Sequence, residues 1–220
     1  MLRGMRIGVI GSGLTGGKLG TVFARAGHEV VFSYARSTAK LETLAEAAGA
    51  TARAGSPAEA VRGADAVLLA VHWNRIDDVL AQTGALAGKT LITCSLPMSA
   101  DDSQLVVGLK TSGAETLAAK LPRARVVSAF STVPSEVLFA VFAARQKKTR
   151  PDLVYCGDHK GSKSTAAELI RDAGFNPVDL GGLTLARYVE PFSLLAAQIA
   201  YEGLHGPALA YRFEHLKERN

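Results

Sequence analysis

The sequence predicts an α/β protein with a doubly wound parallel sheet, because three of its features are typical of that class. Apolar runs rich in β-branched residues alternate with helical segments, as expected for parallel strands joined by crossover helices. The run 65–71 is apolar after its first residue, which indicates a central strand buried on both faces. A glycine-rich turn, 11–17, directly follows the first apolar run. The end of the chain is expected to add a short helical C-terminal part.

Each expected element is predicted from the local hydrophobic pattern and from the residues that begin or end helices and strands. Ser56 and Pro57, for example, form a good N-cap and first-turn pair for a short helix. We expect strands at 6–10, 29–32, 51–54, 65–71, 89–94, 125–130, 153–157 and 176–180. We expect helices at 18–26, 38–48, 58–62, 76–86, 135–144 and 164–173, and one ending over 116–120. An apolar segment at 183–201, interrupted by Pro191, indicates a buried helix or a subunit contact.

Composition narrows the classes of function and suggests one internal boundary. The chain has 220 residues, 48% of them hydrophobic, and a mild formal charge of +5. The densest basic run, 145–150, lacks interleaved aromatic residues and is too short for a nucleic-acid footprint, so no nucleic-acid partner is expected. We interpret it as a solvated loop and as the boundary between a domain at 1–145 and a C-terminal extension at 151–220.

The two cysteines and the apolar runs bear on location. Cys94 and Cys156 show no C-x-x-C spacing, so we expect neither a metal site nor a disulfide, and a cytoplasmic location. No signal peptide is recognised, and the apolar runs are broken well before the roughly 20 residues of a membrane span. We therefore expect no membrane association.

The turn 11–17 has the spacing of a dinucleotide-binding fingerprint, G-x-G-x-x-G, between an expected strand and an expected helix. Gly11 permits the tight turn, Gly13 allows close approach to a pyrophosphate, and Gly16 lets the helix pack on the strand. The free N–H groups at the helix start face the anion. The strand before this turn and the helix after it favour a dinucleotide-binding turn of the Rossmann type over a glycine-rich turn that binds no ligand. The cofactor-binding residues expected here are Gly11, Ser12, Gly13, Leu14, Thr15 and Gly16.

The tip of the second expected strand indicates which dinucleotide binds. Folds of this type meet the adenosine ribose here, and an acidic residue selects the free 2′-hydroxyl. Positions 33–37 contain no Asp or Glu. Arg36 offers a guanidinium fork suited to a phosphate, and Ser33 and Ser37 offer hydroxyl donors. The sequence therefore predicts NADP(H), the alternative being an ordinary surface arginine.

Further candidates follow other strands, at the sheet edge where open α/β folds bind ligands. Val71, His72 and Ser95 are expected beside the cofactor, although a loop histidine is usually only a polar surface group. Trp73 either packs against the ligands or caps the core. Candidates for the substrate pocket are Trp73, Pro97, Met98, Ser131, Thr132, Val133, Tyr201 and His205. Ser95, Ser131 and Thr132 would supply polar contacts, and Trp73, Pro97, Met98 and Val133 apolar walls.

With these residues assembled, the chain resembles the small NADP oxidoreductases that use the deazaflavin coenzyme F420. The ferric-reductase domains of the STEAP proteins look like more distant members of the group. The matching segments are 10–16, 27–30, 33–37, 127–134 and 182–190, which together span most of the chain. The resemblance implies a Rossmann domain with a short helical C-terminal part, a homodimer, and a pocket that holds the second substrate over the nicotinamide.

The resemblance has one departure, which leaves the acceptor open. The deazaflavin reductases are expected to have a histidine where this chain has Ser131. The expected reaction is hydride transfer between the nicotinamide and a planar acceptor such as F420 or a flavin, with no essential acid–base residue. One alternative is an imine or keto reductase with a proton donor, Tyr201 or His205, from the C-terminal helices. Others are a non-catalytic NADP(H)-binding sensor and an empty scaffold.

Overall fold

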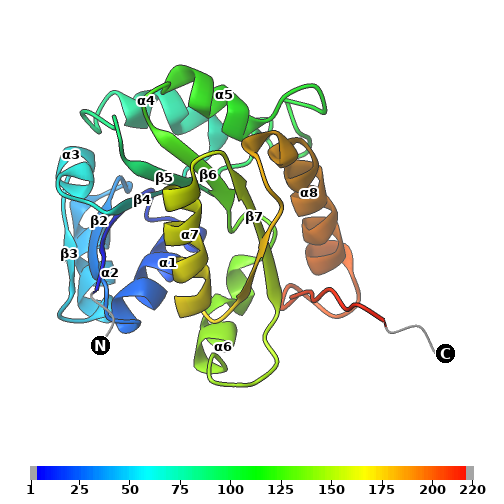
Figure 1. Cartoon of the computed structure of the whole chain (residues 1–220). Helices are drawn as coiled ribbons and strands as arrows, with labels where there is room; N and C mark the ends of the chain where they lie inside the picture. The colour runs from blue at the N-terminus through cyan, green and yellow to red at the C-terminus, as the bar shows by residue number, and fades with distance from the viewer. Residues whose placement is uncertain (1–3, 217–220) are drawn as a thin grey trace.

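An eight-stranded sheet forms the centre of the molecule, and the computed structural model describes residues 4–216 of the chain (Figure 1). The strand order is β3-β2-β1-β4-β5-β6-β7-β8. The strands are β1 (Arg6–Ile10), β2 (Glu29–Ser33), β3 (Ala52–Ala54), β4 (Ala66–Leu69), β5 (Thr90–Thr93), β6 (Arg125–Ala129), β7 (Asp152–Gly157) and β8 (Asn176–Asp179). The chain reverses direction across the sheet at the β1–β4 step, as in a doubly wound fold. The predicted fold class is confirmed.

Helices cover both faces of this sheet (Figure 1). They are α1 (Leu14–Arg25), α2 (Thr38–Ala48), α3 (Pro57–Val61), α4 (Ile76–Leu80), α5 (Gly113–Lys120), α6 (Leu138–Ala143), α7 (Lys160–Asp172) and α8 (Ala186–Glu202). Short 3₁₀ segments are η1 (Trp73–Arg75), η2 (Ser135–Val137) and η3 (Leu183–Leu185). Ser56 caps α3 in a reciprocal capping box with Glu59, as the Ser-Pro pair predicts.

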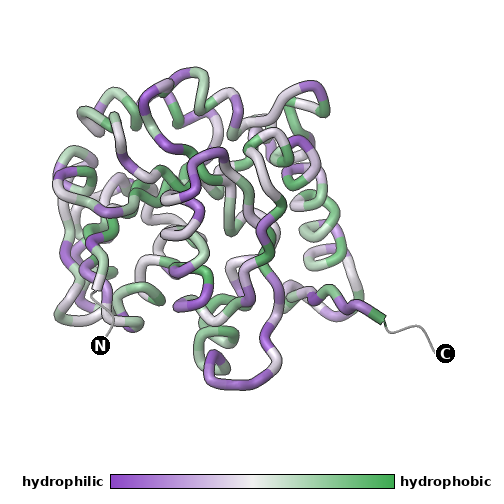
Figure 2. The backbone as a smooth tube through the Cα atoms, viewed as in Figure 1, coloured by the Kyte–Doolittle hydropathy of each residue, from purple (hydrophilic) through white to green (hydrophobic). Residues whose placement is uncertain are grey.

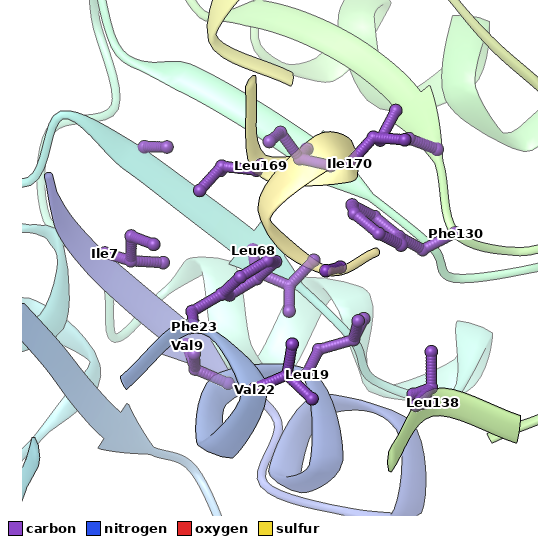
Figure 3. Close-up of a cluster of buried hydrophobic side chains, with 14 of the residues drawn as sticks. Ile7, Val9, Leu19, Val22, Phe23, Leu68, Phe130, Leu138, Leu169 and Ile170 are labelled. Carbon is purple, nitrogen blue, oxygen red and sulfur yellow. The ribbon is translucent and has the colours of Figure 1, made fainter. Parts of the chain in front are cut away.

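Two hydrophobic cores lie on opposite faces of the sheet, because neighbouring residues of a strand point to opposite sides. Val9 packs into one core with α1, α2, α6 and α7, whereas Ile10 packs into the other with α3, α4, α5 and α8. Figure 3 shows the first core, where Leu19 and Phe23 of α1 lie near Leu68. Because both faces of the central strands are buried, the sequences of these strands are continuous apolar runs.

One strand runs against the predicted parallel direction, because β7 pairs antiparallel with β6. The connection between them contains η2, α6 and loops. The register places Ala129, the last residue of β6, opposite Tyr155, and it places Val127 opposite Gly157, the last residue of β7. The chain therefore enters β7 from the edge where β6 ends.

The predicted helix 76–86 is also wrong in its second half, since α4 ends at Leu80. The Thr83 hydroxyl donates to the Leu80 carbonyl (2.9 Å), and Gly84 adopts a left-handed conformation with φ +70°. These contacts close the helix with a turn that the apolar periodicity conceals. The opposite error occurs at Pro191, where α8 continues through the residue expected to interrupt it.

The basic run 145–150 forms the loop after α6, which is coloured as hydrophilic in Figure 2. Lys147 and Lys148 are exposed there. Beyond this loop, β7 and β8 extend the same sheet that the earlier strands build. The boundary between 1–145 and 151–220 stays a prediction.

The crossing of α1 over the end of β1 depends on missing side chains. A Cβ on Gly16 would lie 1.9 Å from the Gly11 carbonyl oxygen and 3.0 Å from the Ala70 Cβ. Gly11 itself has φ +98°, and a Cβ there would lie 2.3 Å from the Ala70 carbonyl oxygen. The backbone of the turn therefore packs directly on the ends of β1 and β4.

Gly16→Ala is therefore expected to lower the free energy of unfolding by about 1–3 kcal/mol or more, because backbone must move to admit the methyl group. Gly13→Ala is the matched control in the same turn. No atom lies within 4 Å of its added Cβ, so only the weaker N-cap preference of Ala should lower its free energy of unfolding, by about 0.5–1 kcal/mol and less than in Gly16→Ala. Chemical denaturation measures both. Equal destabilisation by the two variants would contradict this account of the crossing.

Candidate functional site

A cavity of about 220 Å³ lies where the start of α1, the ends of β5 and β6, and α8 meet. Open α/β sheets bind ligands at this edge, outside the carboxyl ends of the strands. The lining residues are Leu14, Thr15, Cys94, Leu96, Phe130, Ser131, Thr132, Val133, Pro134, Ser135, Ser193, Ala196, Ala197 and Tyr201. The cavity thus joins the glycine fingerprint to segments that lie far away in the sequence.

The glycine turn has the features that a pyrophosphate requires. The Gly11 N–H donates to the Ser33 carbonyl (3.0 Å) and the Ser12 N–H to the Tyr34 carbonyl (3.2 Å), which fixes the turn against β2. Among residues 4–216, the N–H groups of Leu14 and Thr15 have no backbone acceptor. Gly13 is exposed, with open space where a Cβ would stand. These residues therefore fit a dinucleotide phosphate at the start of α1.

Not all of the residues predicted to bind the 2′-phosphate are accessible to a ligand in the structure. Arg36 is exposed in the loop after β2, and no hydrogen bond or ion pair joins its side chain to the described part of the chain. Ser37 caps α2, its hydroxyl accepting from the Lys40 N–H (3.3 Å). The Ser33 hydroxyl is fully buried and donates to the Val9 carbonyl (2.8 Å). Arg36 and Ser37 thus face solvent, while the Ser33 hydroxyl is used within the sheet.

Val71, His72 and Ser95 lie at the ends of β4 and β5, outside the set that lines the cavity. The buried Ser95 hydroxyl accepts from the Val71 N–H (3.2 Å) and donates to the Leu69 carbonyl (3.4 Å). It therefore joins the two strand ends. His72 is exposed, with its Nδ1 3.6 Å from an Asp102 carboxylate oxygen.

Three of the predicted pocket walls lie elsewhere. Trp73 is half-buried against the core beneath α4 and α5. Pro97 packs on Gly113 at the start of α5, and Met98 pairs with Leu105 in an isolated bridge. The sequence places these strand ends correctly, but the side chains of Trp73 and Pro97 pack toward α4 and α5 rather than toward α1.

The turn after β6 supplies the predicted pocket residues that do line the cavity: Ser131, Thr132 and Val133. It begins at Phe130, a buried residue with φ +67° that packs edge-on against Phe23. Such a backbone conformation costs energy for a bulky side chain, so the surrounding packing must hold it. Ser131 accepts from the Ser193 hydroxyl (3.0 Å), and Thr132 shares a hydrogen bond with the Tyr211 hydroxyl (2.8 Å).

Tyr201, predicted as a proton donor, lines the cavity from α8, whereas His205 is exposed and does not line it. The Tyr201 hydroxyl donates to the Glu136 carboxylate (3.0 Å). Burial and this carboxylate raise the pKa of Tyr201 to about 12. Ser135, also on the cavity wall, accepts from the Lys18 ammonium (3.1 Å) and donates to Glu136 (3.3 Å). A chain of polar groups thus connects α1 with α8 along the rim.

Several lining residues were missed by sequence reasoning: Cys94, Leu96, Phe130, Pro134, Ser135, Ser193, Ala196 and Ala197. Those at the ends of β5 and β6 were adjacent to predicted candidates. The α8 residues carry no motif, although the spacing 193, 196, 197 and 201 places them on one helical face. Burial raises the pKa of the Cys94 thiol to about 12, so this thiol stays protonated and is a poor nucleophile.

Two carboxylates join α8 to α5. Glu190, only 3% exposed, accepts from the Gly113 N–H (2.9 Å) and the Ala114 N–H (3.0 Å) at the start of α5. Burial raises the pKa of its carboxyl, and these two donors oppose the rise. Glu115 forms a bidentate ion pair with Arg187, with contacts of 2.7 and 2.9 Å. We call this set the α5–α8 clasp; it holds α8 in place as a wall of the cavity.

Two general properties of the described residues complete the site. Within 4–216, no helix has the length and apolar character needed to cross a membrane. In the same range, no three or more His, Cys, Asp or Glu side chains are grouped so as to hold a metal ion.

Comparison with known proteins matches this arrangement to one family. Residues 6–97 match the model of the family described as NADP oxidoreductase, coenzyme F420-dependent. Metalloreductase STEAP3 of Rattus norvegicus is 30% identical over 189 residues, covering 86% of this chain and 36% of the relative. Human metalloreductase STEAP2 is 26% identical over 192 residues, covering 87% and 36%. The chain thus spans about a third of the length of these curated relatives.

Solved structures share the fold across nearly the whole chain. A putative F420-dependent NADP reductase from Arthrobacter superposes with a TM-score of 0.83 at 22% identity, covering 96% of this chain and 100% of that one. A hypothetical protein from Sinorhizobium meliloti superposes with a TM-score of 0.72 at 28% identity, covering 96% of each. An imine reductase from Myxococcus stipitatus, solved with NAD⁺, superposes with a TM-score of 0.64 at 16% identity, covering 89% and 61%.

The matched segment is thus similar to NADP-dependent oxidoreductases. Over residues 6–97 the chain is similar to the F420-dependent NADP oxidoreductase family, and over most of its length it is similar to the STEAP metalloreductases at low identity. The resemblance read from the sequence is confirmed.

The α5–α8 clasp predicts a pH-dependent stability. Bonding to Arg187 is the main cause that lowers the pKa of Glu115 below its ordinary 4.5. A lowered folded-state pKa means that Glu115 stabilises the fold above about pH 4.5 and loses this effect as the pH falls through the lowered value. Glu115→Gln should therefore reduce the midpoint of thermal unfolding by a few degrees at pH 7, with a difference that shrinks below pH 4.5.

Thermal unfolding of wild type and variant across this pH range measures the effect. Glu42→Gln, an exposed glutamate on α2, is the control and should match wild type throughout. A Glu115→Gln deficit that stays constant with pH would contradict a role for the ionised carboxylate.

Proposed function

We propose that this protein transfers a hydride between NADP(H) and a planar acceptor of the flavin or deazaflavin class. The observation that carries the proposal is the cavity that begins at Leu14 and Thr15 of the fingerprint and ends at α8. A ring bound in this cavity would lie beside the cofactor that the fingerprint holds. The nicotinamide supplies the redox chemistry, so the protein has to bind, orient and exclude water.

The proposed cofactor contacts divide between two ends of the site. The start of α1 would hold the pyrophosphate through the Leu14 and Thr15 N–H groups, beside the open space at Gly13. Arg36, exposed without a side-chain partner among the described residues, is suited to the 2′-phosphate together with Ser37. Val71, His72 and Ser95 remain proposed neighbours of the cofactor.

The acceptor side of the proposal rests on the walls of the cavity. Phe130, Val133, Ala196 and Ala197 are apolar and Ser131 is polar, a combination that suits a flat ring with polar edges. Holding two rings in near-attack geometry can lower a barrier by about 7–11 kcal/mol. F420, a free flavin and a quinone-like ring all belong to the proposed acceptor class, because Ser131 replaces the histidine expected for F420.

A second candidate is an imine or keto reductase, favoured by the position of Tyr201 on the cavity wall. Its hydroxyl, hydrogen-bonded to Glu136, keeps its proton well above neutral pH and would be available to a reacting nitrogen or oxygen. A fold similar to that of an imine reductase agrees with this candidate. A non-catalytic NADP(H)-binding sensor is the third.

The proposal includes a homodimer and a cytoplasmic location. On α8, the side chains of Tyr188, Leu195 and Ile199 are 64%, 57% and 54% exposed and follow one face at helical spacing. Contiguous apolar side chains of this kind are typical of subunit contacts. Cys94 and Cys156 are free thiols, which is consistent with a reducing compartment.

Arg36→Ala tests the cofactor assignment. Losing a charge-assisted contact to the 2′-phosphate should raise the KM for NADPH about tenfold to a hundredfold. The KM for NADH should change little, since NADH lacks that phosphate. Arg62→Ala, an exposed arginine just before β4 at the opposite edge of the sheet, is the control. Equal effects of Arg36→Ala on both cofactors would refute the assignment.

NADPH oxidation with F420, FMN, riboflavin and a quinone offered side by side tests the acceptor class. We expect turnover with at least one of these rings, retained in Tyr201→Phe because hydride transfer needs no proton from Tyr201. Confirmed NADPH binding without turnover on any ring would reject the proposed acceptor class. A bell-shaped pH–rate profile for an imine or ketone that disappears in Tyr201→Phe would favour the second candidate.

A further inference from the structure

Two serine hydroxyls meet inside the cavity, and one of them comes from a helix that no motif marks. Ser131 lies on the turn after β6, and Ser193 lies on α8 and is 2% exposed. Both line the cavity, with their oxygens 3.0 Å apart. This pair is built by the tertiary fold, since the two residues are 62 positions apart in the chain.

The geometry of the contact shows how the pair is oriented. The Ser193 hydroxyl has one proton and two acceptors within reach, the Ser131 oxygen (3.0 Å) and the Val189 carbonyl (2.9 Å). This one proton is shared between the two oxygens, and the contact with Ser131 has the geometry of donation by Ser193. No residue within 4–216 accepts a hydrogen bond from Ser131. The Ser131 proton is thus left for whatever occupies the cavity.

The helix that carries Ser193 is held from behind by the α5–α8 clasp. Glu190, three residues earlier, is bound to the start of α5, and Val189 is 2% exposed in the core. The Ser193 oxygen is therefore fixed relative to the sheet, and it limits how Ser131 can rotate. A hydroxyl held in this way presents its proton with little loss of rotational freedom on binding.

We propose that Ser193 is a positioning residue that holds Ser131 as a hydrogen-bond donor to the acceptor ring. This inference rests on the proposed function and specifies its substrate as a ring with a carbonyl oxygen or ring nitrogen at its edge. Two electrons and a hydrogen nucleus pass from the reduced nicotinamide to the acceptor, which becomes an anion. Ser131 stabilises the negative charge on that oxygen or nitrogen and keeps its own proton; water protonates the reduced ring.

Riboflavin binding, followed by quenching of its fluorescence without any cofactor present, tests the proposal. Ser131→Ala should raise the dissociation constant about threefold to tenfold, the usual effect of one neutral hydrogen bond. Ser193→Ala should raise it by a similar factor. The double variant should bind no more weakly than Ser131→Ala alone, because both changes remove the same donor.

Ser164→Ala is the matched control. Its hydroxyl makes the same contact with a carbonyl four residues earlier, but Ser164 lies on the exposed face of α7. This variant should bind riboflavin as wild type does. A Ser193→Ala variant that binds riboflavin normally would overturn the inference, and so would effects of the two single changes that add in the double variant. Absence of riboflavin binding by the wild type would also overturn the inference, whereas the proposed function fails only if no ring supports NADPH oxidation.

Discussion

The geometry of the site depends on a carboxylate buried between α8 and α5. Glu190 satisfies the N–H groups of Gly113 and Ala114, which would otherwise lie buried without partners at a cost of about 1–3 kcal/mol each. Burial opposes the ionisation of this carboxyl, and the two N–H donors and the positive end of the α5 dipole offset that cost. The half-buried Arg187–Glu115 ion pair adds a second contact between the same helices. Together they fix α8, and with it the cavity wall formed by Ser193 and Tyr201.

The opposite wall depends on the absence of side chains. Gly16 and Gly11 bring α1 against the ends of β1 and β4, so that the free N–H groups of α1 open toward the same edge of the sheet as the cavity. One wall is thus set by backbone packing and the other by side-chain contacts between helices. This division matches the proposed function, in which the start of α1 holds the dinucleotide and the cavity holds the acceptor.

The sequence predicted the fold well wherever a local pattern carried the information. The strand of the fingerprint and the helix α2 have the predicted bounds, and β4 lies within its predicted apolar run. The errors arise from contacts that are not local. Thr83 ends α4 early through a hydroxyl contact, and β7 pairs antiparallel with β6 across a connection whose path no local pattern specifies. In the site, strand ends predicted the turn at 131–133, which lines the cavity, whereas Trp73, Pro97 and Met98 do not line it and their role stays a prediction.

Hydroxyl groups show most clearly why the acceptor is harder to predict than the cofactor. Ser33, Ser131 and Thr132 look equivalent in the sequence, each beside the end of an apolar strand. In the structure the Ser33 proton is used within the sheet, and Thr132 shares a bond with Tyr211 from the end of the chain. The Ser131 proton has no acceptor within 4–216, and its oxygen accepts from Ser193 on a distant helix. The chemistry of the cavity is therefore decided by which hydroxyls the tertiary fold has already satisfied, and this information is absent from any single segment.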